Sequence, residues 1–249
     1  MKPLNLLLST AAAAVIFAGC GGAHHGPHWA YEGHEGPSHW GELAAEYKMC
    51  GMGAEQSPID LTVTENVTES SLELSYAVSG LDEVNNGHTI KFNYAPGSYL
   101  TVDGTRYELL QFHFHAPSEH TVDGTHRPIE FHLVHKSEEG QLAVIGVMVK
   151  EGSENTAFAE VIANLAYNSG ETVKKSEVVI DMNTLLPSRE KFFHYTGSLT
   201  TPPCSEKVEW FVLEEPVEFS KAQIAAFEKA YLHNNRPVNP LNKRVLYIK

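Results

Sequence analysis

Basic residues are scarce in this sequence compared with acidic ones. Lysine and arginine number 18 and aspartate and glutamate 31, which gives a formal net charge of −13. A protein that binds the phosphate backbone of nucleic acid needs a cluster of basic side chains. The charge balance therefore argues against nucleic acid as a partner, although it says little about the fold.

Long hydrophobic runs are missing after residue 19, and so are internal repeats and a second linker. No later segment has the stretch of about 20 apolar residues that a transmembrane helix needs. A chain of 249 residues could form one domain or two smaller ones. Without a second linker, we expect one domain over residues 28–249, as a monomer or as a homodimer.

Residues 1–19 have the features of a secretory signal peptide. Lys2 precedes a mostly apolar stretch over residues 4–18. Ala18 and Gly19 then lead into Cys20, as at the bacterial cleavage site that leaves a lipid-bearing cysteine, although Phe17 stands where that pattern usually has leucine. We expect removal of residues 1–19, a flexible tether over residues 20–27 and a lipid anchor on Cys20. The alternative is an ordinary signal peptide that is cleaved nearby.

Cysteine is rare, and the three residues, Cys20, Cys50 and Cys204, fit an exported protein. We expect the protein in a bacterial cell envelope, in the periplasm or at the surface, anchored in a membrane by its lipid. If Cys20 carries the lipid, an even pair remains, and an oxidising compartment allows Cys50 and Cys204 to form a disulfide. Two buried free thiols are the alternative.

The remaining chain is mostly composed of strand patterns separated by turns. Strands are predicted over residues 99–102, 105–115, 128–135, 142–150 and 208–213, the first two joined as a hairpin by Asp103-Gly104. An apolar stripe predicts a helix over residues 154–167, and Ser220 with Gln223 forms a capping-box pattern before a helix over residues 220–232. The fold class is therefore mainly β with a few short helices, in a single domain built on a large, twisted, mostly antiparallel sheet.

Two histidines on one predicted strand carry the first chemical signal. Alternate side chains of a strand share a face, so Gln111, His113 and His115 lie on one face and Phe112 and Phe114 on the other. The phenylalanines can pack in the core while both imidazoles face a common cavity. Such a pair can bind one metal ion, although two histidines at this spacing also occur by chance.

A third histidine follows on the next predicted strand. Glu130, His132 and Val134 share one face there, and an antiparallel pairing of the two strands would bring His132 to His113 and His115. Three neutral imidazoles with one open position are typical of a catalytic zinc site, whereas a structural site would have a fourth protein ligand. Gln111 and Glu130 can orient the imidazoles by hydrogen bonds.

Several segments resemble the alpha carbonic anhydrase family, in the order that the family has them. The match covers nearly all of the chain after residue 27. The segments are HWAYEGHEGPSHW (28–40), QSPID (56–60), NNGH (85–88), QFHFHAPSEHTVDG (111–124), IEFHLVH (129–135), LAVIGV (142–147), GSLTTPPC (197–204) and NNRPVNPLN (234–242). The combination of the two histidine strands with the Ser-Leu-Thr-Thr-Pro-Pro loop is highly specific.

The resemblance implies a role for each matching residue. His113, His115 and His132 correspond to zinc ligands, with Gln111 and Glu130 behind them. Thr200 corresponds to the threonine that orients the attacking oxygen, and Glu119 to the carboxylate that holds this threonine. His88 corresponds to the proton shuttle, and Tyr31 to a residue that orders the water chain leading to it.

The resemblance also implies a substrate pocket and the disulfide. Thr201 corresponds to a residue that contacts the substrate, and the apolar wall beside carbon dioxide is formed by Val134, Val144, Leu199, Val208 and Trp210. Cys50 and Cys204 match a disulfide pair of bacterial members. Lys91 and Ala116 depart from the family pattern, which normally has a polar neutral residue and an aromatic residue at these positions.

The implied function is zinc-dependent, reversible hydration of carbon dioxide to bicarbonate and a proton. Three alternatives stay open: a family member without activity that acts as a binding module, a zinc-binding exported lipoprotein without catalysis, and a zinc esterase. The lipoprotein hypothesis rests on the N-terminal histidines His24, His25, His28, His34 and His39, which could equally be solvated. A catalytically inactive member would be expected to lack a zinc histidine, and the sequence has all three.

Overall fold

A computed structural model of the chain describes residues 27–249. The predicted signal peptide, the lipid site at Cys20, His24, His25 and the predicted tether up to residue 26 lie outside these residues. Among the helices of the described part, none is long and apolar enough to cross a membrane.

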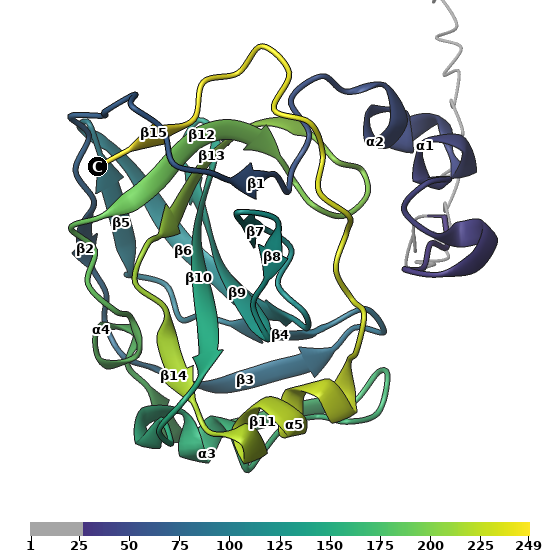
Figure 1. Ribbon diagram of the computed structural model, residues 1–249. Helices are drawn as coiled ribbons and strands as arrows, with labels where there is room; N and C mark the ends of the chain where they lie inside the picture. Colours follow the sequence, from purple (N-terminus) through teal and green to yellow (C-terminus); the bar gives the residue numbers. More distant parts are fainter. Residues whose placement is uncertain (1–26) are drawn as a thin grey trace, which may run out of the picture.

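A large twisted sheet runs through the molecule, and the helices lie at its margins (Figure 1). The strands are β1 (Asp60–Leu61), β2 (Glu73–Ser75), β3 (Ser79–Asn85), β4 (Ile90–Asn93), β5 (Tyr99–Val102), β6 (Thr105–His115), β7 (Thr121–Val122), β8 (Thr125–His126), β9 (Ile129–Ser137), β10 (Leu142–Glu151), β11 (Thr172–Ile180), β12 (Phe192–Ser198), β13 (Glu206–Leu213), β14 (Val217–Phe219) and β15 (Tyr247–Ile248). The helices are α1 (Trp40–Leu43), α2 (Met49–Met52), α3 (Ala159–Ile162), α4 (Met182–Leu185) and α5 (Lys221–Ala230), with 3-10 turns η1 (Gly33–Glu35), η2 (Ala45–Tyr47) and η3 (Thr156–Phe158).

The large sheet has 12 strands, in the order β11-β3-β4-β6-β9-β10-β13-β12-β15 with β2, β5 and β14 attached at its sides. Neighbouring strands are antiparallel except where β10 pairs in parallel with β13 and β14. A separate small sheet contains β1, β7 and β8. The predicted fold class is thus confirmed, as are the predicted hairpin of β5 and β6 and the strands that match β9, β10 and β13.

The two faces of the large sheet bury different sets of side chains. Phe112 and Phe114 lie on one face in a core rich in phenylalanine, where Phe227 of α5 stacks on Phe114 with ring centroids 4.2 Å apart. Val144, Val208 and Trp210 belong to a second apolar cluster. The alternation expected for residues 111–115 is therefore present, because the phenylalanines are buried in the first core.

The predicted helix over residues 154–167 is wrong in its extent. The chain forms η3 and α3 and leaves the helix after Ile162. The peptide of Ala166 is instead bound by β3: its N–H donates to Oε1 of Glu83 over 2.6 Å, and its carbonyl accepts from Nδ2 of Asn85 over 2.9 Å. These tertiary hydrogen bonds replace the helical ones. By contrast, α5 begins with the predicted capping box of Ser220 and Gln223.

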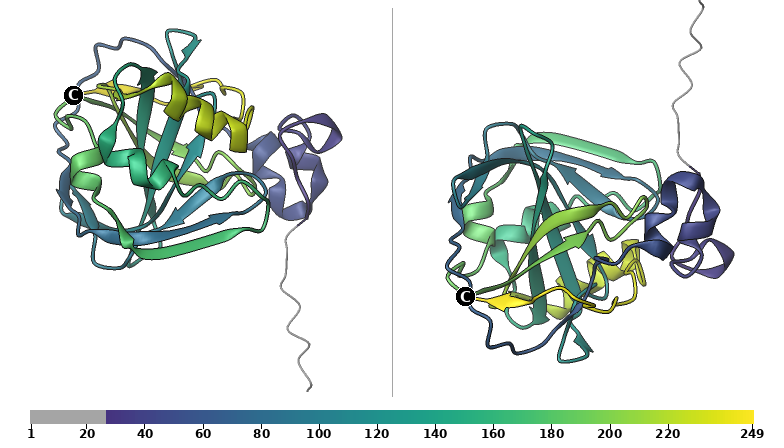
Figure 2. Two further views of the ribbon diagram at one scale, coloured as in Figure 1. Left: turned by 90° about the horizontal axis from the view of Figure 1, so that it is seen from below. Right: turned by 90° about the horizontal axis from the view of Figure 1, so that it is seen from above.

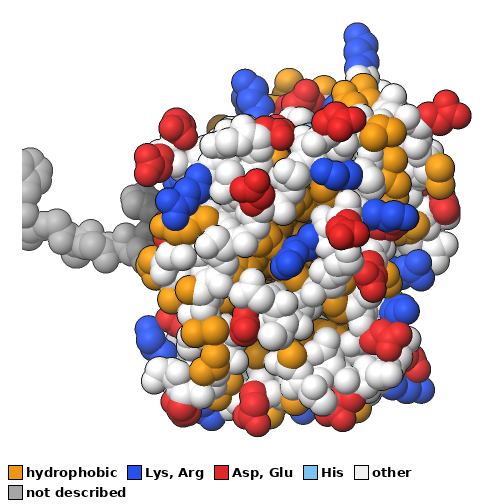
Figure 3. Space-filling model, turned by 90° about the vertical axis from the view of Figure 1, so that its left-hand side faces the viewer, with side chains coloured by type: hydrophobic (Ala, Val, Ile, Leu, Met, Phe, Trp, Pro, Cys, Tyr) orange, Lys and Arg blue, Asp and Glu red, His pale blue; other side chains and the backbone are white. Residues whose placement is uncertain are grey.

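A small N-terminal unit, residues 28–52, lies beside the sheet (Figure 2). It includes α1 and α2, which were not predicted from the sequence. Trp40 is fully buried in it and donates its indole N–H to the carbonyls of Ala30 and Glu35. On the face of the molecule drawn in Figure 3, acidic and basic side chains are interspersed rather than gathered into patches of one sign.

Candidate metal centre

Three histidines meet on the face of the sheet where β6 and β9 lie side by side. The antiparallel register places His113 opposite His132 and His115 opposite Glu130. One ring nitrogen from each of His113, His115 and His132 lies within 4.8 Å of the other two, a spacing that could hold a metal ion. The predicted cluster of three histidines depended on an antiparallel pairing of these two strands, and that pairing is formed.

Each imidazole has one nitrogen fixed by an oxygen atom. His113 donates from Nδ1 to Oε1 of Gln111 over 2.9 Å, and His132 donates from Nε2 to Oε1 of Glu130 over 2.8 Å. His115 donates from Nδ1 to the backbone carbonyl of Asn234 over 2.7 Å. These bonds leave Nε2 of His113, Nε2 of His115 and Nδ1 of His132 as the available acceptors.

The free nitrogens fit zinc. Nε2 of His115 is buried and has no hydrogen-bond partner in the part of the chain that the structure describes. A buried orphan of this kind costs free energy unless a ligand satisfies it. Three imidazole nitrogens with no cysteine among them match the ligand set of a catalytic zinc site.

The pKa values of the histidines on β6 and of the histidine on β9 are shifted in opposite directions. Burial lowers the pKa of His113 and His115, which favours the neutral, metal-binding form. Burial is also the largest single effect on His132 and lowers its pKa, but the charge of Glu130, the hydrogen bond to Glu130 and the charge of Glu119 together outweigh it and raise the pKa of this histidine. Glu130 is an acid, so burial alone would raise its pKa. His120 and His132 nevertheless hold the pKa of Glu130 well below its ordinary value.

Glu119 is fully buried beside the three imidazoles. Its Oε1 accepts the backbone N–H of Arg236 over 2.9 Å, and its Oε2 lies 3.5 Å from Nε2 of His115. Oε2 has no hydrogen-bond partner among residues 27–249. The bond from the Thr200 hydroxyl that the family resemblance implies is therefore not formed in this structure, although Thr200 is itself buried.

The apolar residues expected to line a substrate pocket belong to one cluster. Val144, Val208 and Trp210 are buried in it, and Val134 and Leu199 pack against it. The ring of Trp210 lies 4.8 Å from that of His132, so the cluster adjoins the metal centre. Thr201 is half-buried in the loop after β12.

His88 and Tyr31 are connected through an aromatic residue that the sequence analysis did not assign. Trp29 stacks on His88 with ring centroids 3.7 Å apart, and its centroid lies 5.3 Å from that of Tyr31. Burial lowers the pKa of His88, and a further effect comes from nearby His28. Burial and the charge of Glu119 raise the pKa of Tyr31. Lys91 pairs with His113 across β4 and β6, which places its charge beside the cluster.

A buried chain of polar side chains extends behind His132. Glu130 accepts from Nδ1 of His120 over 2.7 Å, Nε2 of His120 lies 2.7 Å from the hydroxyl of Tyr195, and that hydroxyl lies 2.8 Å from Oγ of Ser57. His120, Glu130 and His132 form a second group with metal-ligand spacing, but the hydrogen bonds already occupy it.

The C-terminal segment supports the site in a way that the sequence patterns did not reveal. Asn234 holds His115, and Arg236 holds Glu119, both through backbone atoms. Both residues lie in the segment 234–242, which the sequence analysis had recognised only as a family motif. No strand or helix periodicity relates them to the histidines, so the family motif was the one signal in the sequence, and it does not give their contacts.

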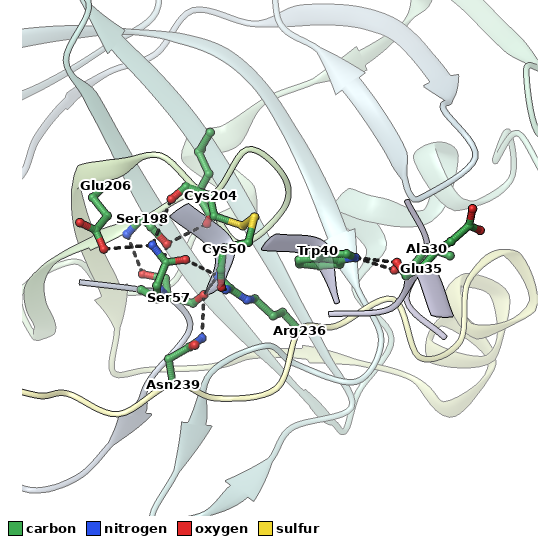
Figure 4. Close-up of a disulfide and its surroundings, with 12 residues drawn as sticks. Ala30, Glu35, Trp40, Cys50, Ser57, Ser198, Cys204, Glu206, Arg236 and Asn239 are labelled. Atoms are coloured by element: carbon green, nitrogen blue, oxygen red, sulfur yellow. Dashed lines mark hydrogen bonds between the residues drawn. A yellow bond between two sulfur atoms is a disulfide. The ribbon is translucent and has the colours of Figure 1, made fainter. Parts of the chain in front are cut away.

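The expected disulfide joins Cys50 to Cys204, which follows the Thr200 loop (Figure 4). The buried guanidinium of Arg236 donates to the backbone carbonyls of Cys50 and Ser57 over 2.8 Å each. Gln56 donates to the carbonyl of Cys204 over 3.1 Å. Burial lowers the pKa of Arg236 to about 10. The disulfide, Arg236 and Glu119 thus form one connected support beside the metal centre.

The fold and the three imidazoles define a candidate metalloenzyme built on a large β-sheet, and known proteins match it closely. The family model described as eukaryotic-type carbonic anhydrase matches residues 35–249. A carbonic anhydrase of Klebsiella pneumoniae is 46% identical over 222 residues, which are 88% of this chain and 90% of that protein. A carbonic anhydrase of Nostoc sp. is 44% identical over 223 residues, which are 88% of this chain and 84% of that protein.

A solved structure has the same fold. The complex of the alpha-carbonic anhydrase from Thermovibrio ammonificans with the inhibitor sulfanilamide superposes with a TM-score of 0.86 at 45% identity, covering 89% of this chain and 99% of that chain. The chain belongs to the eukaryotic-type, or alpha, carbonic anhydrase family. It is accordingly an enzyme of the carbonic anhydrase class, which are lyases.

Proposed function

We propose that this protein catalyses the zinc-dependent, reversible hydration of carbon dioxide to bicarbonate and a proton. The observation that carries the proposal is the convergence of three imidazole nitrogens, from His113, His115 and His132, beside the buried apolar cluster that contains Val144, Val208 and Trp210. A metal site next to an apolar wall suits a substrate that is itself apolar.

The three histidines would hold the ion. Zinc bound there would supply hydroxide at neutral pH by lowering the pKa of a water molecule, a role for which carbonic anhydrase is the standard example. Each imidazole is kept in position by a hydrogen bond from its other ring nitrogen. The acceptors are Gln111, Glu130 and the carbonyl of Asn234.

Thr200 and Glu119 orient the nucleophile in this proposal. A hydroxyl that donates its proton to a carboxylate must act as an acceptor toward any other partner. Oε2 of Glu119 is buried and free to accept, so we assign it to the Thr200 hydroxyl in the working enzyme. The Thr200 hydroxyl then accepts a hydrogen bond from the attacking oxygen, which directs a lone pair of that oxygen toward the carbon atom of the substrate.

The remaining residues bind the substrate and move the proton. Carbon dioxide would lie against Val134, Val144, Leu199, Val208 and Trp210, with Thr201 at its side. After bicarbonate leaves, a proton must reach solvent, and a histidine is suited to relay it near neutral pH. We assign this step to His88, with Tyr31 ordering the water between the imidazole and the site.

The test is a stopped-flow assay of carbon dioxide hydration on the purified protein before and after treatment with a zinc chelator. The account predicts rapid hydration, loss of the activity on chelation and recovery when zinc is added. Zinc binding without any hydration above the buffer rate would instead indicate an exported zinc-binding protein.

We further propose that the protein is exported and held in a bacterial cell envelope by a lipid on Cys20. The support comes from the sequence of residues 1–20, in which an apolar stretch ends at a cysteine. Cys20→Ser is expected to release active protein into the soluble fraction. Continued sedimentation of the variant with membranes would contradict the anchor.

A further inference from the structure

One buried side chain connects a metal-binding histidine to the loop that carries His88. Asn234 is 2% exposed. Its backbone carbonyl accepts from Nδ1 of His115 over 2.7 Å, and its Oδ1 accepts from the N–H of Ala116 over 2.8 Å. Its Nδ2 donates to the carbonyl of His88 over 3.1 Å and to that of Phe114 over 3.0 Å. The side-chain amide of Asn234 thus has hydrogen-bond partners both at the end of β6, which carries His113 and His115, and on the loop that carries His88.

The loop has its own internal hydrogen bonds, but these do not fix its position relative to the metal centre. Oδ1 of Asn86 accepts the N–H groups of His88 and Thr89 over 2.9 Å each. These bonds give the turn its shape. Two bonds leave the turn toward the metal centre. The hydroxyl of Thr89 donates to the carbonyl of Phe114 over 2.7 Å, and Nδ2 of Asn234 donates to the carbonyl of His88 over 3.1 Å. Only the bond from Asn234 ends on His88 itself.

The ring of His88 is held separately. It stacks on Trp29 at an interplanar angle of 8°. Trp29 belongs to the N-terminal unit, whereas Asn234 belongs to the C-terminal segment. A displacement of the His88 backbone would therefore misalign the stack, and the stack provides a local probe of where the backbone lies.

We propose that the side-chain amide of Asn234 is a positioning group for proton transfer, because it holds the backbone of His88 at a fixed distance from the strand that carries His113 and His115, while the backbone carbonyl of the same residue accepts from His115. The two tasks reside on different atoms of one residue, so substitution of the side chain separates them. This inference rests on the proposed function, because it takes His88 as the proton relay and the three histidines as the zinc site.

Two variants remove the side-chain contacts to different extents. Asn234→Ala deletes the amide and keeps the backbone carbonyl that accepts from His115. Asn234→Asp keeps an oxygen for the N–H of Ala116 but places a second oxygen where Nδ2 donated to His88 and Phe114. Gln223→Ala is the matched control, because Gln223 is a buried amide on α5 that is hydrogen-bonded to Asn155 and Ser220 rather than to the site.

The first readout is structural and independent of activity. Stacking on an indole shifts the ring protons of His88 upfield in the NMR spectrum, and these resonances can be followed in zinc-free and zinc-loaded protein. We expect them to move toward the values of an exposed histidine in Asn234→Ala and Asn234→Asp but not in Gln223→Ala. Zinc content is expected to stay at one ion per chain in all three variants.

The second readout is the division of the kinetic effect. Loss of one hydrogen bond to the loop is expected to lower kcat about three- to ten-fold in both Asn234 variants, while kcat/KM changes less than about two-fold. Imidazole-type buffers are expected to restore most of the lost kcat, because they can carry the proton in place of His88.

Unchanged His88 resonances in both Asn234 variants would overturn the inference, since the loop would then hold its own position. Parallel losses of zinc and of kcat/KM would also overturn it, because Asn234 would then act on the metal centre alone. If His88→Ala shows no loss of kcat, the proposed shuttle fails, and the resonances still decide whether Asn234 positions the loop.

Discussion

Each of the three clustered histidines gives one ring N–H to a fixed oxygen and turns its other nitrogen toward a shared space. For His113 and His132 the fixed oxygen lies two residues away on the same strand, on Gln111 and Glu130. Strand alternation places such pairs on one face. This part of the site can therefore be derived from the sequence with elementary geometry.

Thr200 and His88 act at different stages in the proposed mechanism, and their substitution is expected to have different kinetic effects. Thr200→Ala removes the group that orients the nucleophile and should lower kcat/KM about 100-fold. His88→Ala should lower kcat about ten-fold or more at low buffer concentration and leave kcat/KM nearly unchanged. Stopped-flow measurements over a range of carbon dioxide and imidazole buffer concentrations separate the two effects.

The control for Thr200 is Thr196→Ala on the preceding strand. Its hydroxyl bonds to Glu209 rather than to the site, so both kinetic constants should stay close to those of the unsubstituted protein. Equal decreases of kcat and kcat/KM in His88→Ala, without rescue by buffer, would remove His88 from the proton path. The charge of Lys91, which lies opposite His113, would then be the first cause to examine.

The rest of the site could not be predicted by periodicity. Asn234 and Arg236 reach His115 and Glu119 through backbone atoms, whose hydrogen bonds do not depend on the residue type. His120 lies in the loop after β6, where alternation no longer says which way a side chain points. A family motif marks such residues, but only the folded chain assigns their contacts.

At the scale of whole elements, the five strands that were predicted are present with nearly the predicted bounds, whereas one of the two predicted helices is wrong in its extent. β5 and part of β6 alternate between buried and less buried residues. β9 and β10 are buried on both faces, so they follow from short apolar runs bounded by turn residues rather than from alternation. The helix over residues 154–167 failed because Glu83 and Asn85 bind the Ala166 peptide. An apolar stripe indicates only which side chains are buried. It gives no information on a strand more than 80 residues earlier whose side chains hydrogen-bond the same backbone groups.

Glu83 makes the same region of β3 sensitive to pH. Its side chain is fully buried, and burial raises its pKa to about 7, with a further contribution from Glu171. A raised pKa in the folded state means that the folded protein binds more protons than the unfolded chain between about pH 4.5 and 7. The contribution of Glu83 is therefore fully favourable below this range and is lost as the pH rises through it.

Glu83→Gln is expected to remove this pH dependence. The free energy of unfolding of the variant, relative to the original protein, should rise by as much as about 3 kcal/mol between pH 4.5 and pH 8. Glu177→Gln, at an exposed position of the adjacent β11, is the control and should show no such trend. Denaturant unfolding at several pH values measures the difference, and a constant offset would contradict the assignment.

At the scale of the whole molecule, the disulfide ties the N-terminal unit to the loop after Thr200 across a sequence separation of 154 residues. The chain-entropy model gives about 5 kcal/mol for closing a loop of this length, and actual bridges often contribute less. Cys50→Ser with Cys204→Ser is expected to lower Tm by about 5–15 °C. Calorimetry measures the shift, with reduced unsubstituted protein as the second comparison.

Zinc should remain bound in that double variant, because neither sulfur belongs to the metal cluster. Metal analysis of the folded variant therefore distinguishes a structural disulfide from one that is needed for the site. Loss of zinc at a temperature where the variant is still folded would indicate that Arg236 and Glu119 transmit the disulfide's support to the ligands.

Titration of zinc into zinc-free protein shows whether zinc at His113, His115 and His132 makes the protein a carbon dioxide hydratase. The rate of hydration is measured after each addition. We expect a rate that rises in proportion to zinc and levels off at one equivalent, with His194→Ala behaving in the same way and His115→Ala staying inactive. Full activity without zinc, or an active His115→Ala variant at one equivalent, would contradict this role of zinc.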